Sequence, residues 1–345
     1  MGRGSMALRA KSALCLVAVF AVLLATTVSG LYAKPSDFPL LGKSFVAEIN
    51  SKARGQWTAS ADNGYLVSGK SLEEVRKLMG VTDMSTEAVP PRNFSVVEMQ
   101  QDLPEFFDAA EHWPMCVTIS EIRDQSNCGS CWAIAAVEAI SDRYCTLGGV
   151  PDRRISTSNL LSCCFICGFG CYGGIPTMAW LWWVWVGITT EVCQPYPFGP
   201  CSHHGNSDKY PPCPNTIYDT PKCNTTCEKS EMDLVKYKGG TSYSVKGEKE
   251  LMIELMTNGP LEVTMQVYSD FVGYKSGVYK HVSGDLLGGH AVKLVGWGTQ
   301  GGVPYWKIAN SWNTDWGDKG YFLIQRGSNE CGIESGGVAG TPAQE

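Results

Sequence analysis

The sequence has no excess of positive charge, because its 28 lysines and arginines are outnumbered by 34 aspartates and glutamates, giving a net charge of −6. Nucleic-acid-binding proteins usually carry a basic surface, so this balance argues against a nucleic-acid partner. After residue 30 no apolar run reaches the about 18–20 residues needed to cross a bilayer, so we expect no membrane span. The chain also has only five histidines, which narrows the search for a catalytic base.

The first 30 residues differ from the rest of the chain. A basic beginning precedes an apolar stretch from Ala13 to Ala25, and small residues follow at positions 28–30. That order is typical of a secretory signal peptide, which is removed from the mature protein. We therefore predict a signal peptide at 1–30 and a soluble protein routed to a lysosome or endosome, or secreted.

Residues 31–102 contain no cysteine, whereas the rest of the chain is rich in it. The chain has 15 cysteines, and removal of Cys15 with the signal leaves fourteen. Such a density is typical of an oxidising compartment, where each disulfide stabilises a fold by roughly 2–4 kcal/mol. The change in composition predicts a boundary between about residues 84 and 102.

Cys131 is a candidate nucleophile because it stands where a helix begins. An Ala-rich helix is predicted over Trp132–Tyr144, with Ser130 as its N-cap. Unpaired N–H groups and about half a positive charge at a helix N-terminus lower the pKa of a thiol. We therefore expect a reactive thiolate at Cys131 rather than half of a disulfide.

His290 is the best candidate for the base. It follows two glycines and precedes an alternating apolar stretch, Ala291–Trp297, which is predicted to be a strand. Asn310, after the predicted strand Tyr305–Ala309, can orient the imidazole through its second nitrogen, and Trp312 can cover that contact. A histidine held on a strand can accept the thiol proton in a fixed geometry.

Gln125 lies six residues before Cys131 and completes the set. Its side-chain N–H and the backbone N–H of Cys131 can stabilise the oxyanion that forms when sulfur adds to a carbonyl, an effect of about 3 kcal/mol. Taken singly, Gln125 and Asn310 are better explained as turn or surface amides, and His290 as a buried structural residue. Their joint appearance, in the order Gln, Cys, His and Asn, favours a thiol-based catalytic site.

The run Cys128-Gly129-Ser130-Cys131-Trp132 carries the signature by which this chain resembles the papain-like cysteine proteases, and within them the cathepsin B group. The resemblance implies that Gln125, Cys131, His290 and Asn310 are catalytic and that no cofactor or metal is needed. It implies an α+β fold, with a helical lobe, a β-barrel-like lobe and an active-site cleft between them. Further strands are predicted at Leu261–Tyr268 and Tyr321–Gln325. Peptide and protein substrates, cystatin-type inhibitors and a monomeric state are also implied.

The same resemblance implies a propeptide at 31–92, with the boundary between 84 and 102, and a mature peptidase domain at 93–345. In the family such a segment lies backwards along the cleft and blocks it until acid and proteolysis release it. Ser71 to Glu74 predicts the capping box of a short helix within it. An ordinary N-terminal subdomain is the alternative interpretation.

The candidate base and amide lie 159 and 179 residues after Cys131, whereas the family expectation is about 130–150. The extra segment at 193–213 resembles the occluding loop of cathepsin B, whose two histidines bind the C-terminal carboxylate of a substrate. His203 and His204 take those positions, which implies removal of dipeptides beside endopeptidase activity. Without the resemblance, a solvated loop or a zinc site with nearby cysteines would be the interpretation.

One match to the family and two departures from it concern specificity and the loop. Gly173–Gly174 match the site that pairs with an extended substrate, although a plain turn is the alternative. Mammalian cathepsin B has a glutamate where this chain has Gly336, so we predict an apolar or aromatic P2 residue in preference to arginine. Lys209–Tyr210 stand where an arginine would pair with Asp315, which predicts an easily opened loop, while the contact of His203 with Asp124 remains available.

The resemblance also implies six disulfides and a free Cys331. The implied pairs are Cys116–Cys145, Cys128–Cys171, Cys163–Cys223, Cys164–Cys167, Cys193–Cys227 and Cys201–Cys213. Asn93 and Asn224 stand in N-glycosylation sequons, the latter between Cys223 and Cys227.

Two functions other than proteolysis are compatible with parts of the sequence. A catalytically inactive binding module of the same fold would have lost a catalytic residue, yet the candidates are all present. Acyl transfer to amines would use the same thiolate, but the glycine-lined cleft and the paired histidines favour hydrolysis.

Overall fold

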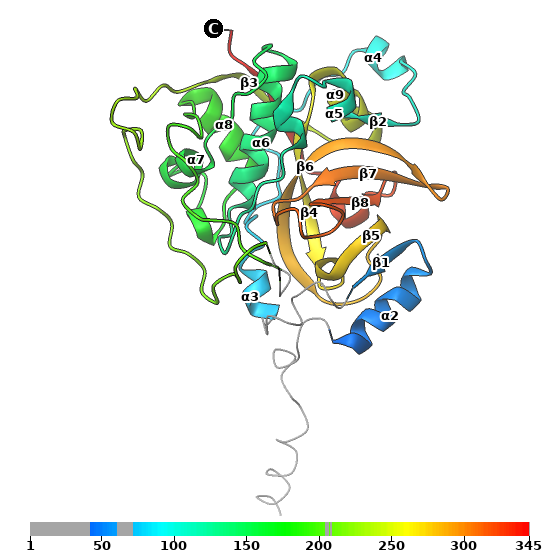
Figure 1. The fold of residues 1–345 in the computed structure, drawn as a ribbon. Helices are drawn as coiled ribbons and strands as arrows, with labels where there is room; N and C mark the ends of the chain where they lie inside the picture. The colour runs from blue at the N-terminus through cyan, green and yellow to red at the C-terminus, as the bar shows by residue number, and fades with distance from the viewer. Residues whose placement is uncertain (1–41, 61–71, 204–206, 208, 345) are drawn as a thin grey trace, which may run out of the picture. The chain divides into compact units, whose positions relative to one another are not determined.

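The structure is a computed structural model that describes residues 42–60, 72–203, 207 and 209–344 (Figure 1). The predicted signal peptide and His204 lie outside these residues, as does Ser71 of the predicted capping box. In the part of the chain that is described, no helix is both long and apolar enough to cross a membrane.

One lobe is built around helix α6 (Cys131–Thr146), with α7 (Thr157–Cys163) and α8 (Pro176–Trp185) packed against it (Figure 1). The α6 helix begins one residue before the predicted start and is buried on every side as far as Cys145. Its many alanines allow this, because small side chains let helices and the sheet approach closely. Other helices are α2 (Lys43–Ala53), α3 (Leu72–Arg76), α4 (Val96–Gln100), α5 (Ala109–His112) and α9 (Glu248–Asn258).

The other lobe is a sheet with strand order β1-β5-β8-β7-β6-β4-β9-β3, in which β2 also pairs with β6. The order has two ends, so the sheet is open, which corrects the barrel-like expectation. The four predicted strands are confirmed as β4, β8 and parts of β6 and β7. Bounds are β1 (Trp57–Ala59), β2 (Phe107–Asp108), β3 (Gly239–Val245), β4 (Leu261–Tyr268), β5 (Tyr274–Tyr279), β6 (Leu286–Gln300), β7 (Val303–Ala309), β8 (Tyr321–Gln325) and β9 (Gly337–Pro342).

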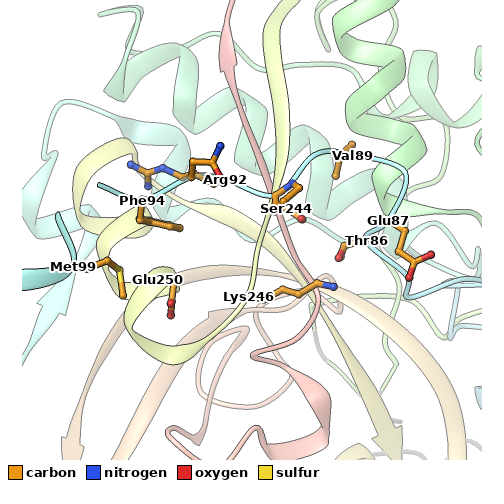
Figure 2. A pocket seen from close by; sticks show the side chains of 11 residues that line it. Thr86, Glu87, Val89, Arg92, Phe94, Met99, Ser244, Lys246 and Glu250 are labelled. Atoms are coloured by element: carbon orange, nitrogen blue, oxygen red, sulfur yellow. The ribbon is translucent and has the colours of Figure 1, made fainter. Parts of the chain in front are cut away.

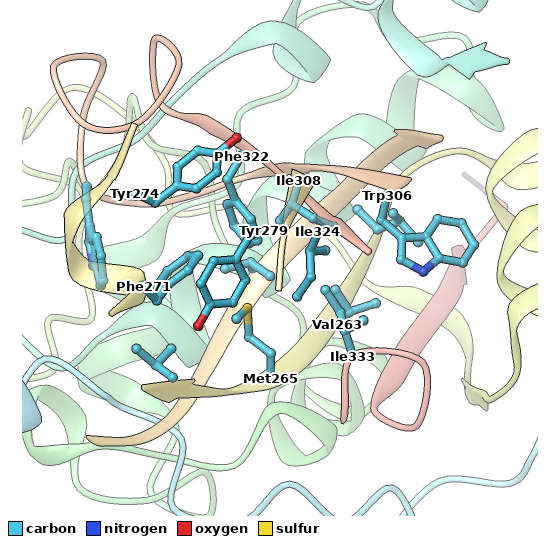
Figure 3. Close-up of a cluster of buried hydrophobic side chains, with 14 of the residues drawn as sticks. Val263, Met265, Phe271, Tyr274, Tyr279, Trp306, Ile308, Phe322, Ile324 and Ile333 are labelled. Atoms are coloured by element: carbon cyan, nitrogen blue, oxygen red, sulfur yellow. The ribbon is translucent and has the colours of Figure 1, made fainter. Parts of the chain in front are cut away.

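Each lobe has its own buried core. In the sheet lobe, the aromatic rings of Phe271, Tyr274, Tyr279 and Phe322 pack mostly edge to face, and those of Phe271 and Tyr274 are stacked (Figure 3). The core of the helical lobe also takes in Ala291 and Val338 from the sheet. The two predicted lobes of the α+β fold are therefore confirmed, and they are packed together along β6 and β9.

A buried ion pair also joins the lobes. Asp142 of α6 and Lys293 of β6 are both fully buried, and Lys293 Nζ lies 2.9 Å from Asp142 Oδ2. Cys131 is the first residue of the same helix, and His290 lies three residues before Lys293 on the same strand. The pair therefore holds the helix of the candidate nucleophile against the strand of the candidate base.

The structure contains six disulfides, Cys116–Cys145, Cys128–Cys171, Cys163–Cys223, Cys164–Cys167, Cys193–Cys227 and Cys201–Cys213. These are the pairs that the resemblance implies, and Cys131 and Cys331 are free thiols. Four of the bridges close loops between residues 163 and 227, where regular structure is sparse. Covalent links there take the place of a hydrogen-bonded framework.

We expect Lys293→Met to lower the free energy of unfolding by about 3–5 kcal/mol, because Asp142 would remain as a buried, unpaired charge. Urea unfolding of protein that also carries Cys131→Ala, to prevent self-digestion, measures this. Lys52→Met is the matched control, because its ion pair with Glu48 is about half exposed, and we expect it to change the free energy of unfolding far less. Equal losses in the two variants would contradict a special role for the buried pair.

Candidate active site

Cys131 is the first residue of α6 and is fully buried. Ser130 occupies the N-cap position as predicted, but its side chain makes no capping hydrogen bond. Its hydroxyl instead pairs with the hydroxyl of Tyr196 at 2.7 Å. The backbone N–H groups of Ala291 and Gly80 act to lower the pKa of the thiol. Because Ala291 directly follows His290, thiol and imidazole come from adjacent points on the two lobes.

His290 is held on β6 with its ring fully buried. Its Nε2–H donates to Asn310 Oδ1 at 2.8 Å, and the Trp312 ring lies 5.2 Å from the imidazole, centroid to centroid. Its Nδ1 is buried and has no hydrogen-bond partner among the described residues. The arrangement leaves Nδ1 as the nitrogen able to take a proton from a thiol.

Gln125 is fixed from both ends of its amide. Its Oε1 accepts hydrogen bonds from Ser311 Oγ at 2.9 Å and from Trp312 Nε1 at 3.1 Å. Its Nε2 donates to the carbonyl oxygens of Cys128, at 2.9 Å, and Leu78, at 3.0 Å. The expected oxyanion donor is thus present, and it already holds a backbone carbonyl of the predicted propeptide.

The predicted propeptide runs through the cleft at residues 78–82. On one side Gly174 donates its N–H to the carbonyl of Gly80 at 2.8 Å and accepts from the N–H of Thr82 at 3.0 Å. On the other side the N–H of Val81 donates to the carbonyl of Gly289 at 3.1 Å. Gly174 therefore pairs with an extended backbone, whereas Gly173 hydrogen-bonds within its own turn, to Gly170 and Phe169. Substrate binding by Gly173–Gly174 stays a prediction.

Gly80 marks the closest approach of this segment to the nucleophile. A Cβ added there would lie 2.0 Å from the carbonyl oxygen of Gly129 and 3.1 Å from the sulfur of Cys131. Only glycine fits without displacing the backbone. The roles of Leu78 and Gly80 were not predicted from the sequence, because a single glycine has many explanations.

The electrostatics differ from the predicted low thiol pKa. Burial raises the pKa of Cys131 to about 11, although backbone hydrogen bonds from Ala291 and Gly80 oppose the rise. Burial also lowers the pKa of His290 to about 4, with the hydrogen bond to Asn310 acting in the opposite direction. Between these pH values both groups are neutral. With the cleft filled, loss of water therefore disfavours the thiolate of Cys131 and the imidazolium of His290 alike.

A buried acid near the nucleophile escaped the sequence analysis. Glu262 of β4 is fully buried, and burial raises its pKa well above the usual range. Trp180 Nε1 donates to its Oε2 at 2.7 Å. An acid inside the apolar stretch of a predicted strand was the signal that could have revealed it.

Two of the attachments of the loop at 193–213 concern the contacts predicted from the sequence. At the first, His203 Nε2 lies 2.6 Å from Asp124 Oδ1, the contact expected from the sequence. At the second, the hydroxyl of Ser207 donates to Asp315, while Lys209 Nζ donates to Thr314 at 2.9 Å. The hydroxyl of Ser207 thus makes the contact with Asp315 that the family's arginine would make.

The zinc interpretation of this loop does not fit its chemistry. The ligand atoms of Cys201, His203 and Cys213 lie within 4.8 Å of one another. The two cysteines, however, form a disulfide and offer no thiolate. His203 in turn is engaged by Asp124.

Three further predicted positions are Gly336 and the two sequon asparagines. A Cβ added to Gly336 would lie 2.0 Å from Oγ1 of Thr264, so a larger residue there requires Thr264 to move. Asn93 and Asn224 are both exposed, as sugar attachment would require.

The chain matches the family model described as "Papain family cysteine protease" over residues 103–341. It is 47% identical to Cathepsin B-like cysteine proteinase 6 of Caenorhabditis elegans over 316 residues, covering 87% of this chain and 83% of that protein. A Schistosoma japonicum cathepsin B-like cysteine proteinase is 44% identical over 314 residues, covering 87% and 90%. The structure of proCathepsin B S9 from Trypanosoma congolense superposes with a TM-score of 0.82 at 47% identity, covering 89% of this chain and all of that one. The chain belongs to the papain family of cysteine proteases and, within it, to the cathepsin B-like cysteine proteinases.

Proposed function

We propose that this zymogen, once its cleft is freed, hydrolyses peptide bonds through a thiolate at Cys131 and an imidazolium at His290. In the proposed mechanism, Nδ1 of His290 takes the thiol proton and the sulfur adds to the substrate carbonyl. Gln125 and the backbone N–H of Cys131 stabilise the oxyanion, while Asn310 orients the imidazole. The imidazolium then protonates the leaving amine, and water, deprotonated by the same ring, hydrolyses the acyl-enzyme.

The observation that carries this proposal is the contact between Gln125 and the carbonyl of Leu78. A peptide carbonyl already occupies the donor proposed for the oxyanion, and the flanking backbone is paired with Gly174 and Gly289. The cleft is therefore shaped for extended peptide, and it uses backbone contacts that do not depend on sequence.

The loop supports a second activity, the removal of dipeptides from C-terminal ends. His203 is anchored on Asp124, and His204 is proposed to join it in binding the terminal carboxylate. General protein degradation in a lysosome or endosome, a monomeric state and inhibition by cystatin-type proteins are part of this proposal. The disulfide density is consistent with such a compartment.

The first test compares the zymogen with acid-activated protein. At pH 6 we expect Cys131 to react with iodoacetamide about 100-fold or more faster after activation, because the thiolate then forms beside an imidazolium. Mass spectrometry of the alkylated peptide and cleavage of a Phe-Arg reporter are measured together. Cys131→Ala should abolish both signals, whereas Cys331→Ser should change neither, since burial raises the pKa of Cys331. A folded, processed chain that cleaves nothing would favour the binding-module alternative.

The second test concerns the P2 residue. Without an acid at position 336, we expect Phe-Arg reporters to be cleaved at least about tenfold better than Arg-Arg reporters, measured as kcat/KM. The double variant Gly336→Glu with Thr264→Ala makes room for a carboxylate and should raise Arg-Arg cleavage. Thr264→Ala alone is the control. Similar values for the two reporters on the natural enzyme would refute the preference.

The third test concerns the loop. We expect Tyr210→Arg, which can pair with Asp315, to raise dipeptide release relative to internal cleavage, because a charged contact is stronger than a neutral one. Ser207→Ala removes the existing contact and should shift the ratio the other way. Both ratios are read from the products of one long peptide. If neither substitution alters the ratio, the second attachment does not control loop opening.

A further inference from the structure

Residues 89–100, called the strap here, lie against the sheet lobe after the chain has left the cleft. The N–H of Ser244 donates to the carbonyl of Pro90 at 2.9 Å, and the N–H of Arg92 donates back to the carbonyl of Ser244 at 2.8 Å. Ser244 belongs to β3, whose other edge is paired with β9. The strap thus covers the edge of the sheet that would otherwise be free.

A buried carboxylate anchors the strap. The Arg92 guanidinium pairs with Glu254, which is fully buried, and with Glu98 of α4 at 2.6 Å. Glu254 also accepts from Arg143 at 2.8 Å and from the hydroxyl of Tyr243 at 2.9 Å. Positive and negative side chains therefore alternate from the buried Arg143, through Glu254 and Arg92, to Glu98 of the strap. Only 14% of the Arg92 side chain is exposed, so this contact is largely shielded from water.

Beside this anchor the strap borders a cavity of about 580 Å³ (Figure 2). Figure 2 shows Arg92 and Phe94 of the strap on one side of it, and Lys246 and Glu250 on another. The Arg92 guanidinium lies 4.2 Å from the centre of the Phe94 ring. Val89 is buried in the helical-lobe core and Phe94 packs against the sheet-lobe core. Arg92 and the Ser244 backbone add polar contacts to this apolar packing.

The connector between cleft and strap, residues 83–88, is bound differently. Asp83, Ser85, Glu87 and Ala88 are exposed. The hydrogen bonds found there are local, from the N–H of Ser85 to Asp83 at 2.8 Å and from the N–H of Glu87 to Ser85 at 3.3 Å. Such a segment is the accessible kind that proteases cut.

We infer that activation cuts the connector and that the strap stays bound to the active enzyme. A cut after the strap, in the exposed stretch 104–106, leaves the cleft-blocking segment tied to the Glu254 anchor, which keeps its effective concentration high. A cut in the connector leaves that segment with its cleft contacts alone, so it dissociates readily. The first active enzyme therefore begins within 83–89, not at the predicted residue 93. The inference rests on the proposed function only in that activation is peptide-bond hydrolysis.

The test is a time course of acid activation followed by intact mass, N-terminal sequencing and reporter cleavage. We expect the earliest active species to begin between residues 83 and 89 and to retain Arg92. An earliest active species that begins at Asn93 or later would overturn the inference. If the earliest fragment begins within 83–89 but cleaves no reporter, the proposed function fails, whereas the position of the first cut in the connector is supported.

Arg92→Gln tests the anchor itself. Loss of a charge-assisted contact to a buried carboxylate should speed conversion to forms beginning at 101–106 by about tenfold. Arg76→Gln is the matched control, because Arg76 is 41% exposed and its ion pair with Glu73 is long, at 3.8 Å. Arg92→Lys, which keeps the charge, should restore most of the slow conversion. Equal conversion rates for Arg92→Gln and Arg76→Gln would overturn the role of the anchor.

Discussion

The buried pair of Asp142 and Lys293 is the constraint on which the active site depends. Cys131 and His290 belong to different lobes, and neither lobe alone can fix the distance between them. Two charges that have lost their water must stay together, because separating them would leave each unpaired in a medium of low dielectric constant. The helix of the nucleophile and the strand of the base are thereby held in register, 2.9 Å apart at the ion pair.

The chemistry of the site then depends on whether water reaches it. With residues 78–82 in the cleft, burial disfavours the charged form of Cys131 and of His290 alike, so each stays neutral. Gly80 is what allows the backbone to come so close. The propeptide therefore blocks access to the sulfur and also removes the charge state that makes the sulfur a nucleophile. Both effects end when the segment leaves.

The exposed connector, which lies between the cleft segment and the anchored strap, is the site at which we infer that cleavage ends the inhibition. Arg92 pairs with a buried carboxylate, whereas the side-chain hydrogen bonds of the connector are local, and four of its six residues are exposed. The weakest part of the N-terminal segment thus lies between two well-held parts. In the loop at 193–213, the hydroxyl of Ser207 donates to Asp315, where the resemblance led us to expect a longer cationic side chain.

The sequence by itself determined the family, the helix at Cys131, four of the strands and the candidates Gln125, His290 and Asn310, because spacing and residue type are properties of the chain. It did not determine that the sheet is open, that the hydroxyl of Ser130 bonds to Tyr196, or that the pKa of Cys131 is raised rather than lowered. Those depend on partners distant in sequence: Tyr196 is 66 residues from Ser130. The start of a helix, which lowers the pKa of a thiol, can be predicted from local sequence. The burial that raises the pKa of Cys131 comes only from tertiary packing.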